Sequence, residues 1–361
     1  MSASDGAADV VTHEVSEAAA RDLLVDLVET PSVTGDEREC AERLAAFFER
    51  HDREARLDEV GNVRAPGDDG VLLTSHVDTV PGEIPVEVEE TDESEVLWGR
   101  GSVDAKGPLA AMAVAAVETG ASFVGVVGEE TDSRGARHLV DERAEPAAVV
   151  NGEPSGWDDL TLGYRGFLAG TYSVAVDSVH TSRPDPNAVE HATGWLSRVK
   201  AEFDGDGDDP VFESVTVKPV AFDGGLADDG LATAATVDVQ FRIPPGTTAA
   251  EIRETAESEL DAGDVSWDEP IPPTLSSPRT DLARAFRVAV RAEGGNPGLL
   301  RKTGTSDANL YAAAWDCPVA TYGPGDSTFD HAPDERLDLA EFDRAVAVLG
   351  RVAENRLENN E

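Results

Sequence analysis

Carboxylate and imidazole side chains follow several segments of the chain that are predicted to be strands. These residues are His76, Asp78, Asp104, Glu129, Glu130, Glu153, Asp330 and His331. In an open α/β sheet, ligands bind beyond the carboxyl ends of the strands. We therefore expect these carboxylates and imidazoles to converge on one edge of a sheet.

A group of this kind needs a cation, because carboxylates packed together without one repel each other strongly. Carboxylate and imidazole ligands in a five-residue set, with one carboxylate shared, suit a two-metal hydrolytic site. Zinc suits these ligands, and cobalt or manganese could substitute. A single His or Glu at the end of a strand is more often a cap or a surface side chain than a ligand, so the prediction depends on the whole set.

The segments that carry these residues alternate between helical and strand patterns. Helices are predicted at residues 17–29, 39–49, 110–118 and 279–291, and strands at residues 71–75, 99–103, 122–127, 147–150 and 319–322. This alternation predicts an α/β fold with a mostly parallel sheet that helices cover on both faces.

The middle of the chain is patterned differently. Half-exposed strands are predicted at residues 166–176 and 231–243, and helices at residues 187–203 and 248–260. This suits an inserted α+β domain with one sheet and two helices. We expect a catalytic domain formed by residues 1–163 and 271–361, and an inserted domain at residues 164–270.

The composition excludes several classes of partner. The 361 residues include 72 acidic and 29 basic side chains, for a formal net charge of −43, and 40% are hydrophobic. Such a chain can bury a core, but it has no basic face for nucleic acid and is disfavoured at an anionic membrane. No apolar stretch reaches the roughly 20 residues that span a bilayer. Residues 1–10 lack the pattern of a signal peptide, so we expect a cytoplasmic protein.

Lysine is scarce: the chain has four lysines, at Lys106, Lys200, Lys218 and Lys302, and its other basic residues are arginines. Acidic excess with scarce lysine predicts a halophile's cytosol, because at about 1 M salt charges are screened within about 3 Å. A specialised acidic protein from an ordinary cell is the alternative. Cys40 and Cys317 lie in no CxxC or Cys/His cluster, so we expect buried free thiols.

The order of the metal-binding motifs resembles that of the M20 metallopeptidases and deacylases, over nearly the whole chain. The motifs are Ser75-His76-Val77-Asp78-Thr79-Val80, Gly99-Arg100-Gly101-Ser102-Val103-Asp104-Ala105-Lys106-Gly107, Gly128-Glu129-Glu130, Asn151-Gly152-Glu153-Pro154 and Asp330-His331. The resemblance implies a homodimeric two-metal amidohydrolase with an inserted lid and dimerisation domain.

The resemblance also implies the ligands of both ions. His76 and Glu153 would bind one ion, Glu130 and His331 the other, and Asp104 would bridge them.

Two further carboxylates have implied roles. Asp78 would orient His76, and Glu129 would be the general base. The ions would lower the pKa of a water, from which Glu129 takes a proton that it later returns to the leaving amine. The peptide between Asp104 and Ala105 would be cis.

In the inserted domain, the resemblance implies substrate contacts. His180 would donate to the oxyanion in the partner subunit's site, with Asn187 in the same lid segment. Arg242 would hold a substrate carboxylate, although a surface salt bridge is nearly as good an interpretation. Gly304, Thr305 and Ser306 would contact substrate, or form a turn and a helix N-cap.

Finer features resemble one branch of the family. The chain is short for the family, Pro108 stands where many relatives have glycine, and residues 323–327 lead directly into Asp330-His331. That branch releases lysine or ornithine from the C-terminal glutamate side chain of an acidic amino-group carrier protein, in lysine or arginine biosynthesis. Arg301 and Lys302 are candidates for contacts with the carrier.

Other activities stay open on the same residues. The alternatives are an N-acetylornithine deacetylase or another small-molecule deacylase, and a scavenging dipeptidase. A non-catalytic binding protein is disfavoured because the five ligands and Glu129 are all present.

Overall fold

The computed structural model describes residues 12–91, 94–204 and 210–359, which form two compact units. Unit 2 consists of Gly163–Leu275 and Arg301–Asn309, and unit 1 contains the other described residues. The second segment of unit 2 belongs to a part of the chain that the sequence pattern assigned to the catalytic domain. Residues 1–10, whose composition argued against a signal peptide, lie outside the described residues.

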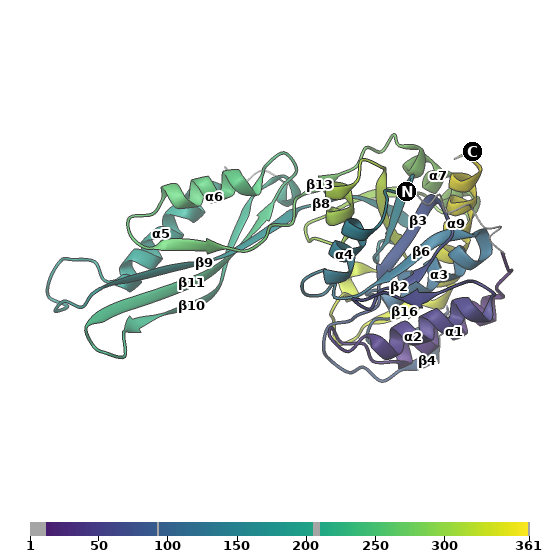
Figure 1. Ribbon diagram of the computed structural model, residues 1–361, viewed down its shortest axis with the longest axis horizontal. Coiled ribbons are helices and arrows are strands. Elements are labelled where there is room, and N and C mark those ends of the chain that lie inside the picture. Colours follow the sequence, from purple (N-terminus) through teal and green to yellow (C-terminus); the bar gives the residue numbers. More distant parts are fainter. Residues whose placement is uncertain (1–11, 92–93, 205–209, 360–361) are drawn as a thin grey trace, which may run out of the picture. The chain divides into compact units, whose positions relative to one another are not determined.

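A mixed sheet forms the centre of unit 1 (Figure 1). Its strands, in spatial order, are β1 (Arg56–Leu57), β2 (Val63–Ala65), β6 (Ala121–Val126), β3 (Asp68–His76), β7 (Val149–Gly152), β15 (Val319–Gly323) and β8 (Gly156–Tyr164), and β14 (Gly298–Lys302) also pairs with β8. The short strand β13 (Thr274–Leu275) belongs to unit 2 and pairs with Gly163 and Tyr164 at the end of β8. The four central strands β6, β3, β7 and β15 are parallel, and the strands beside them are antiparallel. The prediction of an α/β fold with a parallel core is confirmed.

Helices cover this sheet. They are α1 (Glu17–Glu29), α2 (Arg38–Arg50), α3 (Lys106–Thr119), α4 (Arg134–Glu142), α7 (Asp281–Ala292), α8 (Ala308–Ala314) and α9 (Leu339–Glu358). Thr74 and Ser75 are neighbours on β3 and therefore point to opposite faces. The Thr74 hydroxyl lies 3.3 Å from that of Tyr311 in α8, while Ser75 lies against the Ala105 carbonyl directly before α3. The prediction that helices cover both faces is therefore confirmed.

The alanine-rich α3 is buried on every side, in agreement with its lack of a polar face. Pro108 lies in its first turn, where a missing N–H costs nothing. The helix ends at Gly120, whose φ of +82° places it in the left-handed conformation that favours glycine.

A small antiparallel sheet lies beside the central one. It contains β4 (Glu87–Glu90), β5 (Glu95–Trp98) and β16 (Arg336–Asp338), in the order β16-β5-β4. The pairing of β5 with β16 brings the turn after Trp98 close to the segment that follows His331. This pairing joins two parts of the chain that are distant in sequence.

Unit 2 contains one sheet and two helices, as its sequence pattern predicted (Figure 1). Its elements are β9 (Gly166–Asp177), α5 (Ala188–Phe203), β10 (Thr216–Leu226), β11 (Ala232–Ile243), α6 (Ala249–Ser258) and β12 (Asp264–Trp267), in the strand order β10-β11-β9-β12. The sheet has four antiparallel strands, and the pattern predicted two of them, β9 and β11. The unit has its own core, in which the indole of Trp195 stacks on the ring of Tyr172.

The two cysteines are free. Cys40 is buried, as predicted. Cys317 is only partly buried, so the prediction of full burial is wrong for this residue. Among the described residues, no helix combines the length and apolar character needed to cross a membrane.

Candidate metal centre

Parallel strands place three of the sequence-predicted residues at one edge of the sheet. His76 is the last residue of β3, Glu153 directly follows β7, and Glu130 lies in the loop after β6. In the sheet register, Ser75 pairs with Gly152 and His76 with Val126. The three side chains therefore start from the same level of the sheet.

Asp104 reaches this edge from a turn. The sequence predicted a strand at residues 99–103, and that prediction is wrong, because β5 ends at Trp98 and the next residues form turns before α3. Strand pairing is replaced here by a carboxylate, since Glu335 Oε1 accepts the N–H groups of Val103 at 2.9 Å and Asp104 at 3.0 Å. The peptide between Asp104 and Ala105 is cis, as the family resemblance implies.

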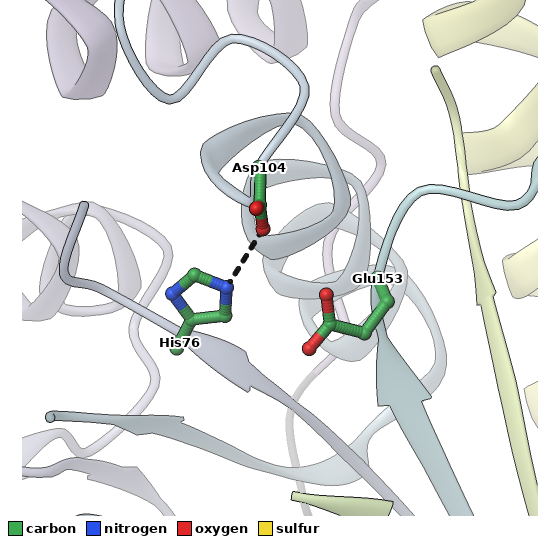
Figure 2. Close-up of side chains that lie close together, drawn as sticks. All are labelled: His76, Asp104 and Glu153. Atoms are coloured by element: carbon green, nitrogen blue, oxygen red, sulfur yellow. Dashed lines mark hydrogen bonds and ion pairs between the residues drawn. The ribbon is translucent and has the colours of Figure 1, made fainter. Parts of the chain in front are cut away.

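Asp104 turns one carboxylate oxygen toward each of two histidines. Its Oδ1 lies 3.1 Å from His76 Nε2, and its Oδ2 lies 3.1 Å from His331 Nε2. His331 Nε2 also lies 2.9 Å from Glu130 Oε2. Figure 2 shows His76, Asp104 and Glu153 facing one another.

The donor atoms form two groups that share one residue. The first is His76, Asp104 and Glu153, the second is Asp104, Glu130 and His331, and the ligand atoms of each lie within 4.8 Å of one another. Ligand atoms around a tetrahedral zinc ion, each about 2.0–2.2 Å from the metal, are about 3.3 Å apart. The separations and the mixture of imidazole and carboxylate donors therefore fit two divalent cations.

The charges of the centre are strongly coupled. Burial would raise the pKa of Asp104, but hydrogen bonds with His331 and His76 outweigh it and hold this pKa well below its usual range. Hydrogen bonds to Asp104 and Glu130 raise the pKa of His331 to about 10. The three carboxylates of the centre therefore stabilise positive charge beside them, whether on an imidazolium or on a bound cation.

The sequence comparison agrees with this geometry. A model of peptidase family M20/M25/M40 matches residues 72–355. The chain belongs to this family.

Relatives in the M20 family match nearly the full chain. The LysW-lysine hydrolase of Deinococcus radiodurans is 41% identical, and the match covers 92% of this chain and 95% of that protein. The LysW-lysine/LysW-ornithine hydrolase of Sulfurisphaera tokodaii is 29% identical, over 91% of this chain and 93% of that protein. A tripeptidase structure from Staphylococcus aureus has a TM-score of 0.78 at 19% identity, and the match covers 96% of this chain and all of that one. The two proteins therefore share a fold.

Asp78, the residue that the resemblance makes the partner of His76, is fully buried. His76 Nδ1 lies 2.9 Å from the main-chain oxygen of Asp78 but 3.7 Å from its carboxylate. That carboxylate accepts the N–H groups of Gly128 at 2.9 Å, and of Glu129 and Glu130 at 3.2 Å each. Burial would raise the pKa of Asp78, but its neighbours lower it to about 2, chiefly His76.

The loop that carries Glu129 and Glu130 is also fixed from its other side. The buried side chain of Asn62 accepts the N–H of Val127 at 3.1 Å and donates to the Gly135 carbonyl at 3.1 Å. Gly128 has a φ of +79°, and a Cβ there would lie 2.4 Å from Arg134 Nη1. The loop therefore presents Glu129 and Glu130 from a rigid backbone.

Other predicted residues lie outside the two ligand groups. Asp330 neighbours His331 in the chain, and its N–H donates to the Ser327 carbonyl at 3.3 Å. His180 is an exposed residue of unit 2. Its Nδ1 accepts the N–H of Ser182 at 3.2 Å, which leaves the proton of the neutral ring on Nε2.

Asn187 is the N-cap of α5, and its side chain accepts the N–H of Glu190 at 3.0 Å. This capping role explains the residue type at that position without a ligand.

Arg242 lies on β11 with its guanidinium 4.8 Å above the Phe167 ring and 3.3 Å from the Thr305 hydroxyl. Burial lowers its pKa, and no carboxylate of the described ranges forms an ion pair with it. The alternative of a surface salt bridge therefore has no support. Ser306 is buried and accepts the N–H of Ala308 at 3.3 Å, which makes it a cap for α8, whereas Gly304 has no atom within 4 Å of its Cβ position.

Sequence patterns did not identify Glu335 or Asn62. Both act through backbone groups, and such contacts leave no periodic signal. The sequence offered one signal for Glu335, which is its position four residues after the candidate ligand His331.

Proposed function

We propose that this chain is a two-metal amidohydrolase that releases lysine, ornithine or both from an amino-group carrier protein. The amino acid would be attached to the carrier's C-terminal glutamate side chain, and the reaction would belong to lysine or arginine biosynthesis. We take the LysW of the relatives' names to be this carrier.

The observation that carries the chemistry is the orientation of Asp104. A buried carboxylate with one oxygen toward His76 and the other toward His331 is arranged to bridge two cations. The choice of substrate rests on the relatives, because two-metal chemistry is common to many amidases.

In this mechanism, His76, Asp104 and Glu153 would hold one ion, and Asp104, Glu130 and His331 would hold the other. When bound, the two ions acidify a water and polarise the amide carbonyl. Zinc suits these ligands, and cobalt or manganese could replace it.

Glu129 acts as the general base. It accepts the proton of the attacking water and returns it to the leaving amine, so the lysine or ornithine departs with a neutral α-amino group. Hydrogen bonds from its own N–H and from the N–H of Glu130 to Asp78 fix its position. Asp78 holds His76 through its main-chain oxygen.

Arg242 holds the α-carboxylate of the released amino acid. Its partly buried guanidinium lacks an acidic partner among the described residues and lies beside Thr305 of the Gly304–Ser306 segment. A planar guanidinium binds a carboxylate with two parallel hydrogen bonds. Asn187 and the Gly304–Ser306 segment complete the substrate contacts in this proposal.

The Nε2–H group of His180 would donate a hydrogen bond to the oxyanion in the site of a second subunit. The proposal of a homodimer through unit 2, the lid and dimerisation domain, is supported by β10. This edge strand pairs with β11 on one side, and its Val220, Phe222 and Leu226 are 55%, 43% and 65% exposed. Exposed apolar edge strands are sites of pairing with another chain.

The composition supports a proposal for the cellular setting. A net charge of −43 with four lysines suits the cytoplasm of a halophile, where high salt screens repulsion between acidic surfaces. The same screening would let an acidic enzyme meet an acidic carrier.

The alternative is an N-acetylornithine deacetylase or another small-molecule deacylase or dipeptidase of the family. The test is amino-acid release by the metal-loaded protein in concentrated potassium chloride, with carrier-linked lysine, carrier-linked ornithine, N-acetylornithine and a dipeptide side by side. Release chiefly from the carrier conjugates supports the proposal. Release from the small substrates alone would refute it and leave the deacylase.

A further inference from the structure

The turn at residues 99–105 carries the bridging ligand but has little regular structure of its own. Among the described residues, the groups that fix it come chiefly from one side chain of another segment. The Glu335 side chain is 1% exposed, and it enters this turn from the residue directly before β16.

Both oxygens of Glu335 are engaged on that turn. Oε1 accepts the N–H of Val103 at 2.9 Å and the N–H of Asp104 at 3.0 Å. Oε2 lies 2.7 Å from Arg100 Nη1, and the Gly99 N–H donates to the main-chain oxygen of Glu335 at 3.4 Å. One residue thus binds the turn at both its start and its end.

The contacts of Glu335 also connect the turn to the segment that contains His331. Glu335 follows His331 by four residues, so it links the segment that supplies one ligand to the turn that supplies Asp104. The pairing of β16 with β5 holds the main chain on both sides of this link. A displacement of Glu335 would therefore move Asp104 relative to His331.

We propose that Glu335 is a positioning residue, whose Oε1 holds the backbone of Asp104 so that its carboxylate can bridge the two metal ions. This inference rests on the proposed two-metal function. It assigns to Glu335 a role in metal affinity at both ligand groups, because Asp104 belongs to both.

Two substitutions distinguish the effect of the length of the Glu335 side chain from the effect of its charge. Glu335→Gln keeps the length of the side chain and an oxygen for the two N–H groups, but it removes the charge. Glu335→Asp keeps the charge and withdraws the carboxylate by one methylene. Arg100→Gln is the matched control, because it removes the same ion pair and leaves Oε1 in place.

The measurement is calorimetric titration of cobalt(II) into the metal-free full chain in concentrated potassium chloride, with the visible cobalt spectrum as a second readout. We expect Glu335→Asp to weaken both ions by ~10–100-fold and to change the spectrum, as loss of an outer hydrogen bond to a ligand does. Glu335→Gln and Arg100→Gln should stay within about threefold of the parent, since they keep the acceptor oxygen.

Three results would overturn the inference. They are unchanged cobalt affinity in folded Glu335→Asp, weakening of one ion only, and equal losses in Glu335→Gln and Glu335→Asp. If Glu335→Gln does not fold because Arg100 is left unpaired, the neutral pair Arg100→Gln/Glu335→Gln replaces it with the same expectation. Failure of the parent to bind two cobalt ions would instead refute the proposed function.

Discussion

Substitution of Asp78 by asparagine tests which part of the centre its carboxylate serves. In the structure, Oδ1 accepts the N–H groups of Gly128 and Glu129, and Oδ2 accepts the N–H of Glu130 and the Thr34 hydroxyl at 2.7 Å. An asparagine keeps one oxygen for the first pair, but its NH₂ group then faces the N–H of Glu130. Two donors cannot bond to each other, so Glu130 loses its anchor.

The size of the effect follows from the bond that is lost. A hydrogen bond to a charged group contributes ~1.5–3 kcal/mol, and about 1.4 kcal/mol is a factor of ten in affinity. We therefore expect the ion held by Asp104, Glu130 and His331 to bind ~10–100-fold more weakly. The ion held with His76 and Glu153 should change little, because His76 is bonded to the main-chain oxygen that asparagine retains.

Anomalous diffraction at the cobalt edge, measured over a range of cobalt concentrations, gives the occupancy of each group separately. Thr34→Val is the matched control, since it removes one donor to the carboxylate and leaves the three N–H bonds. Selective loss of the ion at His76 in Asp78→Asn would refute this reasoning. It would show that the carboxylate acts on the imidazole despite their 3.7 Å separation.

Three further predictions concern other residues. Glu129→Gln should keep both ions and lose ~10²–10⁴-fold in kcat, the range for a missing general base, and loss of metal content would contradict its assignment. A mixture of His180→Ala and Glu129→Gln subunits should regain activity that neither variant has alone, and an inactive mixture that contains hybrid dimers would exclude donation between subunits. Burial raises the pKa of Cys317 to about 11 and also that of Cys40. Because the thiolate is the reactive form, iodoacetamide should label the native chain slowly at pH 8 and faster as the pH rises toward 11. Equal rates in native and denatured protein at pH 8 would disprove this.

Local periodicity was enough to predict much of the fold. The helix expected at residues 17–29 is α1, and the apolar segments before His76 and Glu153 are strands of the parallel core. These elements have strong apolar patterns of their own, so their neighbours were not needed to recognise them. The same reasoning brought the metal-binding residues to one edge of the sheet.

The patterns failed where structure depends on distant partners. Residues 99–103 have the sequence Gly-Arg-Gly-Ser-Val, in which Val103 is the one apolar side chain. Glu335, and not a neighbouring strand, accepts the N–H groups of Val103 and Asp104. The small sheet of β4, β5 and β16 and the edge strand β10 were likewise not predicted. Their residues are largely exposed or come from remote segments, so a single stretch of sequence does not define them.

The position of β15 has a consequence for synthesis of the chain. This strand lies between β7 and β8, which are neighbours in sequence, yet it is made after all of Gly163–Leu275. At about 5–20 residues per second, a ribosome needs roughly 10–30 s to pass from the end of β7 to the end of β15. During that interval the edges of β7 and β8 that pair with β15 have unpaired backbone groups. Only the C-terminal part of the chain can supply the strand that pairs with them. A prematurely terminated chain should therefore aggregate or be degraded before it acquires metal.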